Sequence, residues 1–140
     1  SMGGHGALTI ALKNPTRYSS VSAFSPICSP INCPWGQKVL GELISGNPTD
    51  NQSQWAQHDA AELIKSSSTN TKDSLLVLID QGEADNFLDE QLKIKLLEDA
   101  AAATDFPMHI RMQPGYDHSY FFIATFINEH ISFHASALID

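Results

Sequence analysis

Three residues of this chain have the types and the order needed for acyl transfer to a serine. Ser1 begins the segment Ser-Met-Gly-Gly at positions 1–4, which matches the second half of a Gly-x-Ser-x-Gly turn, a strand-to-helix turn that exposes a serine hydroxyl. Asp85 and His118 follow in the order serine, aspartate, histidine. The histidine would take the serine proton during attack on a carbonyl carbon, and the aspartate would hold the imidazole tautomer.

Such a serine needs a donor for the oxyanion that forms. A helix is predicted from Gly3 to about Asn14, and its free N–H groups and positive dipole end would lie beside Ser1. The backbone N–H of Met2 is the expected oxyanion donor, and the glycines at positions 3 and 4 would permit close backbone approach. The strand that should enter the turn does not precede Ser1 in this sequence, so we expect it to come from another segment.

Strands and helices alternate in the pattern of a parallel α/β sheet. Strands are predicted at Tyr18–Phe24, at the continuous apolar run Leu75–Ile79 and at the alternating run Met108–Gln113, the last as an edge strand. The expected helices cover positions 3–14, 36–44, 54–64, 88–100 and 120–133, with a polar surface connection at 66–73. Asp85 and His118 then lie just after the carboxyl ends of two strands, where active sites of parallel sheets are found.

Other residues compete for these roles. Asp80 and Glu83 lie near Asp85, which could itself be a helix N-cap, while Asp117 is a weaker rival because it adjoins His118. Ser-Met at a chain start also occurs as a protease-cleavage scar. The remaining histidines lack a comparable loop position, and no pair has a convincing metal-ligand context: His5, His58, His109, His130 and His134.

A loop predicted at Cys28–Gly36 would overhang Ser1. Trp35 in this loop is predicted to form a pocket wall, with structural packing as the alternative. The spacing of Cys28 and Cys33 does not fit a Cys-x-x-Cys motif or a zinc site, so reduced thiols are expected, with a labile disulfide as the alternative. An aromatic group is predicted to be core rather than a substrate box: Tyr116, Tyr120, Phe121, Phe122 and Phe126.

Composition narrows the class of protein. The chain has 140 residues, 42% of them hydrophobic and 17% charged, which fits one globular domain. A net charge of -8 argues against nucleic-acid binding. No run reaches the roughly 18 apolar residues of a membrane span, and the start lacks signal-peptide features, so no membrane association and a cytoplasmic location are expected.

Four motifs together resemble the S-formylglutathione hydrolase (esterase D) family. They are Ser-Met-Gly-Gly-His-Gly-Ala-Leu at 1–8, Cys-Pro-Trp-Gly at 33–36, Ile-Asp-Gln-Gly at 79–82 and Gly-Tyr-Asp-His-Ser-Tyr at 115–120. The resemblance implies an α/β-hydrolase fold and hydrolysis of the glutathione thioester to formate and glutathione, with activity on simple carboxyl esters. It implies no metal and no organic cofactor.

By this resemblance the catalytic residues are Ser1, Asp85 and His118, the oxyanion donor is Met2 and the substrate-binding tryptophan is Trp35. Residues 1–140 resemble the carboxyl-terminal half of one such domain and look longer than the family pattern around 46–73. The expected partners are the small ester or thioester substrate and the missing amino-terminal half, with a homodimer left open. The isolated chain is expected to be inactive.

Two alternatives to this hypothesis remain. The chain could be a non-catalytic half-domain that acts only by complementation or binding. It could also be an N-terminal-nucleophile hydrolase in which the amine of Ser1 acts as the base.

Overall fold

A three-stranded parallel sheet is the centre of the fold. The computed structural model describes residues 1–139 and contains β1 (Ser20–Phe24), β2 (Leu76–Gly82) and β3 (His109–Gln113) in the order β1-β2-β3. Val21 is paired with Val77 in β1 and β2, and Ile79 with Ile110 in β2 and β3. The predicted parallel α/β arrangement and the edge position of β3 are confirmed.

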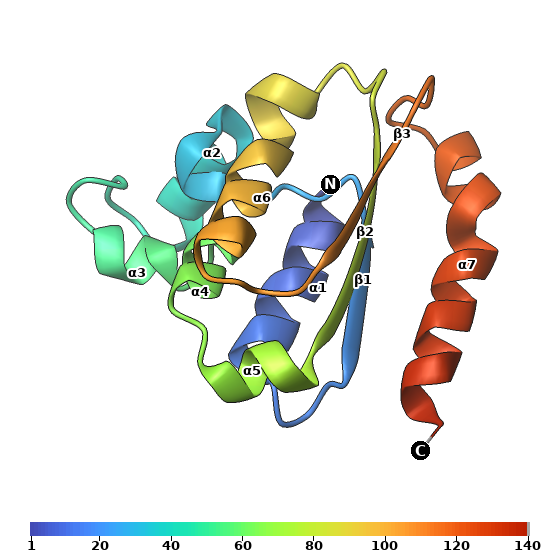
Figure 1. Cartoon of the computed structure of the whole chain (residues 1–140). Helices are drawn as coiled ribbons and strands as arrows, with labels where there is room; N and C mark the ends of the chain where they lie inside the picture. The colour runs from blue at the N-terminus through green and yellow to red at the C-terminus, as the bar shows by residue number, and fades with distance from the viewer. Residues whose placement is uncertain (140) are drawn as a thin grey trace.

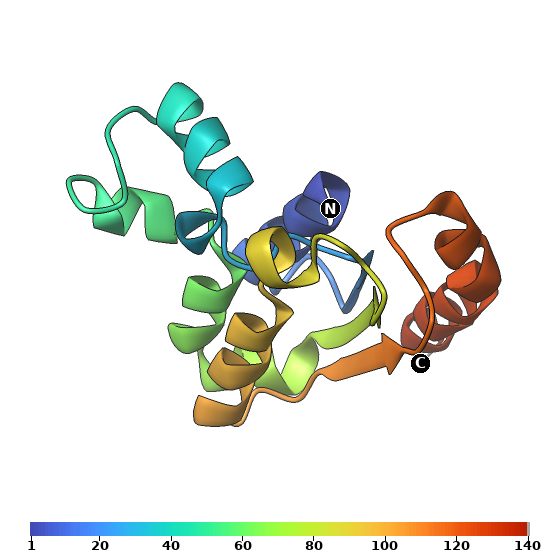
Figure 2. The same ribbon diagram turned by 90° about the horizontal axis from the view of Figure 1, so that it is seen from above.

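Helices cover both faces of this sheet (Figures 1 and 2). Helix α7 lies on one face, where it contacts β1 and β2, and α1, α4 and α6 lie on the other. The helices are α1 (Met2–Lys13), α2 (Pro34–Leu43), α3 (Gln52–Ala56), α4 (Ala60–Lys65), α5 (Thr69–Ser74), α6 (Ile94–Ala103) and α7 (Tyr120–Leu138), with a 3-10 turn at Pro30–Asn32 and a π-helical turn at Leu88–Leu92.

The apolar core lies between the sheet and the α1 side. Its fully buried members include Leu8 of α1, Ile64 of α4, Ile79 of β2 and Leu97 of α6. Burying aliphatic side chains of this size stabilises a fold by about 1.5–3 kcal/mol each. The α7 side is different, because polar side chains carry much of the contact there, as described below.

One predicted helix is two helices. The expected helix at 54–64 is interrupted between α3 and α4, because Asp59 lies there with fully buried backbone and side chain. Its carboxylate accepts hydrogen bonds from Glu62 N–H at 3.0 Å, Ser29 Oγ at 2.8 Å and Ile31 N–H at 3.2 Å. An N-cap bound to a distant loop therefore starts a new helix where periodicity alone predicts continuation.

Other boundaries also differ from the expectation. The polar connection at 66–73 contains α5, which Ser68 caps by accepting from Thr71 N–H. The helix expected at 88–100 is broken at Lys93, whose φ of 57° is left-handed. Helix α7 continues past 133 to Leu138, and β2 continues to Gly82, so Asp80 lies within the strand rather than in a loop.

The aromatic prediction is correct for Phe122 and wrong for two of its neighbours. Phe122 is 1% exposed, whereas Tyr120 is 88% and Phe121 is 75% exposed at the start of α7. Tyr120 lines a cavity together with Ser1 and His118. Cys28 and Cys33 are free thiols, as expected, and both are buried. Within residues 1–139, none of the helices combines enough length and apolar character to cross a membrane.

Candidate active site

Ser1, Asp85 and His118 gather at the carboxyl ends of the strands. Figure 1 shows the N-terminus, the loop after β2 and the loop after β3 toward the same end of the sheet. The Ser1 carbonyl accepts hydrogen bonds from His5 N–H in α1 and from Ile27 N–H in the loop after β1, both at 3.1 Å. These two bonds fix Ser1 at the junction of α1 with that loop.

Asp85 and His118 form a direct pair. The Asp85 Oδ2 atom is 2.8 Å from His118 Nδ1, and the Asp85 side chain is fully buried. The same Oδ2 accepts from Gln81 Nε2 at 3.1 Å, and Oδ1 accepts from Phe87 N–H at 2.9 Å. With Nδ1 bound to the carboxylate, Nε2 is the ring nitrogen left for a reacting group.

Gln81 is a site residue that the sequence did not assign a role. It is 0% exposed and its side chain reaches the Asp85 carboxylate from β2. The signal for it was present in the Ile-Asp-Gln-Gly motif at 79–82, but periodicity does not show where a polar side chain of a buried strand is directed.

The loops that carry Asp85 and His118 are joined backbone to backbone. Ala84 N–H donates to Tyr116 O at 3.0 Å, and Glu83 N–H donates to Gln113 O at 3.0 Å. A Cβ atom at Gly82 would lie 2.2 Å from Tyr116 O, so only glycine permits this approach. The aspartate and the histidine are therefore positioned as one unit.

Ser1 and His118 line one cavity. A cavity of about 250 Å³ is lined by Ser1, His118, Phe24 and Phe122, among others. Within residues 1–139 no hydrogen bond joins the Ser1 hydroxyl to His118. The structure thus brings the aspartate and the histidine into contact and places the serine at the same cavity; nucleophile–base hydrogen bonds are often loose before substrate binds.

Met2 is the first residue of α1, so its backbone N–H belongs to the helix turn that lacks intrahelical acceptors. Its side chain is 61% exposed. A Cβ at Gly4 would lie 2.8 Å from Pro26 Cβ, which shows the close approach expected there, whereas a Cβ at Gly3 would meet nothing within 4 Å. The close approach predicted for both glycines therefore holds for Gly4 alone.

Trp35 lines a second cavity that also reaches Ser1. This cavity has a volume of about 350 Å³ and includes Met2 in its wall. The Trp35 ring lies 4.7 Å from that of Phe87, which in turn stands edge-on to His118 at 5.4 Å. Phe87, which the sequence did not single out, therefore links the tryptophan to the histidine.

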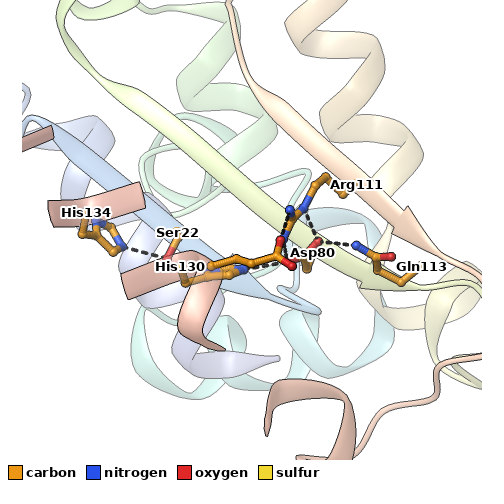
Figure 3. A network of polar contacts seen from close by, with 7 residues as sticks. Ser22, Asp80, Arg111, Gln113, His130 and His134 are labelled. Carbon is orange, nitrogen blue, oxygen red and sulfur yellow. Dashed lines mark hydrogen bonds and ion pairs between the residues drawn. The ribbon is translucent and has the colours of Figure 1, made fainter. Parts of the chain in front are cut away.

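A second aspartate–histidine pair lies on the α7 side of the sheet (Figure 3). Asp80 Oδ2 of β2 is 2.7 Å from His130 Nε2 of α7. The same carboxylate binds the Arg111 guanidinium and accepts from Gln113 Nε2 at 3.0 Å. Burial alone would raise the pKa of Asp80, but the hydrogen bonds from His130, Arg111 and Gln113 and the charge of Arg111 hold it well below its usual value of 3.8.

This second pair has structural surroundings. His130 is 2% exposed and stacks on Phe24 at 3.9 Å. One turn further along α7, His134 binds Ser20 and Ser22 of β1, with both distances 2.8 Å. The sequence analysis gives neither histidine a role. Their four-residue spacing indicates only that they share one face of the helix.

Within residues 1–139, no three or more His, Cys, Asp or Glu side chains are grouped so that they could hold a metal ion.

A serine at the start of a helix and an aspartate–histidine pair on loops after successive parallel strands define an α/β-hydrolase fold. The Esterase family model matches residues 1–133, and the chain belongs to this family. It is 51% identical over 138 residues to S-formylglutathione hydrolase of Arabidopsis thaliana, covering 99% of this chain and 46% of that protein. The chain thus spans about half the length of the curated relative that it matches.

Solved structures agree with this placement. The S-formylglutathione hydrolase of Agrobacterium tumefaciens superimposes with a TM-score of 0.86 at 42% identity, covering 99% of this chain and 47% of that one. A ferulic acid esterase shares the fold at 17% identity and a TM-score of 0.72, over 99% of this chain and 49% of that one. The fluorophosphonate-binding serine hydrolase F of Staphylococcus aureus shares the fold at 19% identity and a TM-score of 0.73, over 100% of this chain and 52% of that one.

Proposed function

We propose that this chain carries the catalytic residues of a serine hydrolase that cleaves S-formylglutathione to formate and glutathione and also hydrolyses simple carboxyl esters. The observation that carries the proposal is the contact between the buried Asp85 carboxylate and His118, beside a cavity that Ser1 also lines. The 51% identity to an S-formylglutathione hydrolase supports the choice of substrate.

In the proposed mechanism, Ser1 Oγ attacks the thioester carbonyl carbon while His118 Nε2 takes its proton. Asp85 holds the Nδ1 tautomer and stabilises the imidazolium that forms. The Met2 N–H donates to the oxyanion at the α1 N-terminus, where the helix dipole favours negative charge. His118 then protonates the departing thiolate, which leaves as glutathione, and water hydrolyses the acyl-enzyme by the same proton path. This mechanism uses no metal and no cofactor.

We propose further that residues 1–140 act as one half of a single α/β-hydrolase domain. Among the described residues β1 is hydrogen-bonded only to β2, so its outer edge is free for another strand. A complementing segment would supply that strand and a second oxyanion donor. On this proposal the isolated chain is inactive, and the competing hypothesis is a half-domain that binds without catalysing.

The nucleophile is tested with an active-site-directed fluorophosphonate probe. The protein for this test, called the completed enzyme below, is this chain joined at Ser1 to the part of the Arabidopsis relative that it does not match. We expect the probe to label Ser1, the label to be located by peptide mass spectrometry, and Ser1→Ala to remove it. Absence of labelling in a folded completed enzyme would favour the non-catalytic half-domain.

Replacing Gln81 by leucine is expected to lower kcat for S-formylglutathione about tenfold with little change in KM. The change removes a buried donor to the Asp85 carboxylate while keeping side-chain size, and a hydrogen bond to a charged group contributes about 1.5–3 kcal/mol. Steady-state kinetics of the completed enzyme measure the effect. Gln52→Leu, at an exposed site in α3, is the matched control. An unchanged kcat in the Gln81 variant would remove Gln81 from the positioning of Asp85.

A further inference from the structure

Two segments that carry site residues are bound to each other beside the active site. One follows β2 and contains Asp85, and the other runs from β1 to the first turn of α2, which contains Trp35. Trp35 N–H donates to Gln91 Oε1 at 2.9 Å, and Cys28 N–H donates to the Leu92 carbonyl at 2.8 Å. The same two segments share a small buried apolar cluster: Ile27, Cys33 and Leu92.

Gln91 is the side chain that fixes the backbone at Trp35. Helix α2 begins at Pro34, which has no N–H, so the N–H of Trp35 is the first donor of the helix and has no acceptor within it. Cys33 Sγ accepts from the next donor, Gly36 N–H, at 3.4 Å. Gln91 is 7% exposed and supplies the acceptor for Trp35 from the segment after β2. The position of Trp35 therefore depends on that segment.

Phe87 lies between Trp35 and the Asp85–His118 pair. Its backbone N–H donates to Asp85 Oδ1 at 2.9 Å. Its ring centre is 5.4 Å from that of His118, with the ring planes at 87°, and 4.7 Å from that of Trp35. Within residues 1–139 the imidazole of His118 makes one hydrogen bond, to Asp85. One hydrogen bond at Nδ1 leaves the imidazole free to tilt about that contact, whereas a second ring packed perpendicular to it restricts the tilt.

We propose that Phe87 is a positioning residue for His118, and that Gln91 acts through Phe87 by holding Trp35 against its ring. This inference rests on the proposed serine hydrolase function. With its tilt restricted, the imidazole keeps Nε2 in the orientation that proton transfer from Ser1 needs. A displacement of a catalytic group by about 1 Å can lower a rate about 10²-fold, so the loss of such a contact is measurable.

Phe87→Leu in the completed enzyme tests the ring. The variant keeps the backbone N–H that donates to Asp85 and removes the ring packed against His118. We expect kcat for S-formylglutathione to fall about tenfold or more, with KM changed by less than about threefold. The rate of fluorophosphonate labelling at Ser1 should fall by a similar factor, because labelling uses the same serine and histidine. Phe87→Tyr keeps the ring at a side chain that is 38% exposed, so about half of kcat or more should remain.

Phe133→Leu is the matched control for this contact. Phe133 also packs its ring against a histidine, His134, with the ring centres 5.2 Å apart and the planes at 70°. Both residues lie in α7 and line neither of the cavities that Ser1 lines. We therefore expect Phe133→Leu to leave both kcat and the labelling rate unchanged.

Gln91 is tested in a double-mutant cycle with Phe87. Gln91→Leu leaves the Trp35 N–H without its acceptor and is expected to lower kcat about fivefold, whereas Gln91→Glu keeps an accepting oxygen and should restore about half of the parent kcat or more. In the Phe87→Leu background, Gln91→Leu should lower kcat by less than about twofold further, because the contact through which it acts is already lost. Gln54→Leu, at an exposed site of α3, is the control.

Urea unfolding of each variant shows whether the folded state is retained. An unchanged kcat in Phe87→Leu, an equal loss in Phe87→Tyr, or effects of Phe87→Leu and Gln91→Leu that multiply in the double variant would overturn the inference. The Gln91 variants leave the Phe87 ring in place and decide the matter if Phe87→Leu does not fold, since equal kcat values in Gln91→Leu and Gln91→Glu would also overturn it. Failure of fluorophosphonate labelling at Ser1 in the parent completed enzyme would instead overturn the proposed function itself.

Discussion

Replacing His118 by alanine is expected to lower kcat for S-formylglutathione by about 10⁴-fold or more in the completed enzyme. The variant has no group that can take the Ser1 proton or pass it to the leaving sulfur, and loss of one triad member in serine hydrolases has effects of this size. The His118 side chain is 26% exposed, so its removal leaves no sealed cavity. Asp85 keeps its hydrogen bonds from Gln81 and Phe87. The rate should therefore fall without loss of the fold.

Steady-state kinetics and urea unfolding of the same preparation separate these effects. His109→Ala is the matched control, because this histidine is exposed at the start of β3. We expect the control to keep full activity. Retention of more than a tenth of the activity in the His118 variant would contradict its role as the base.

Replacing Asp80 by asparagine is expected to lower the free energy of unfolding by about 3–5 kcal/mol. Removing one partner of a buried charged network usually has an effect of this size. The Asp80 side chain is fully buried, and the change leaves Arg111 and His130 without their carboxylate. It also loosens the contact between α7 and the sheet. Urea unfolding of the completed enzyme at pH 7 measures the effect, with the exposed Asp89→Asn as the control.

The same network predicts the sign of a pH dependence. The folded-state pKa of Asp80 is held below 3.8, so its contribution to stability is fully present above that pH and is lost as the pH falls toward the folded-state pKa. The stability difference between the parent protein and Asp80→Asn should therefore narrow as the pH falls below about 3.8. A stability difference that stays constant as the pH falls to about 2, roughly two pH units below that value, would contradict this account.

The sequence predicts the sheet and the Asp85–His118 pair because both depend on local pattern. Strand, polar loop and helix follow one another in the chain, and parallel strands bring successive loops to one edge. The break at Asp59 could not be predicted in this way, since the Asp59 carboxylate is bound by Ser29 from a loop thirty residues earlier. Helix periodicity does not register such a distant partner.

The α7 side of the sheet was the least predictable part. An alternating or continuous apolar run does not show that Asp80 lies inside β2, nor that His130 reaches it from a helix fifty residues later. Residue type predicts that Tyr120 and Phe121 belong to the core, but both are largely exposed at the start of α7. Aromatic character indicates burial only on average.

Asp80 and Asp85 lie on one continuous segment, β2 and the loop that follows it, and each carboxylate binds one histidine of the last part of the chain. His118 precedes α7, and His130 lies within it. A displacement of β2 along its own axis would therefore move Asp80 and Asp85 together, and the two histidines bound to them would follow. The distance between Asp85 and His118 is then insensitive to small movements of the surrounding helices. It depends instead on the few residues of β2 and the loop that follows it.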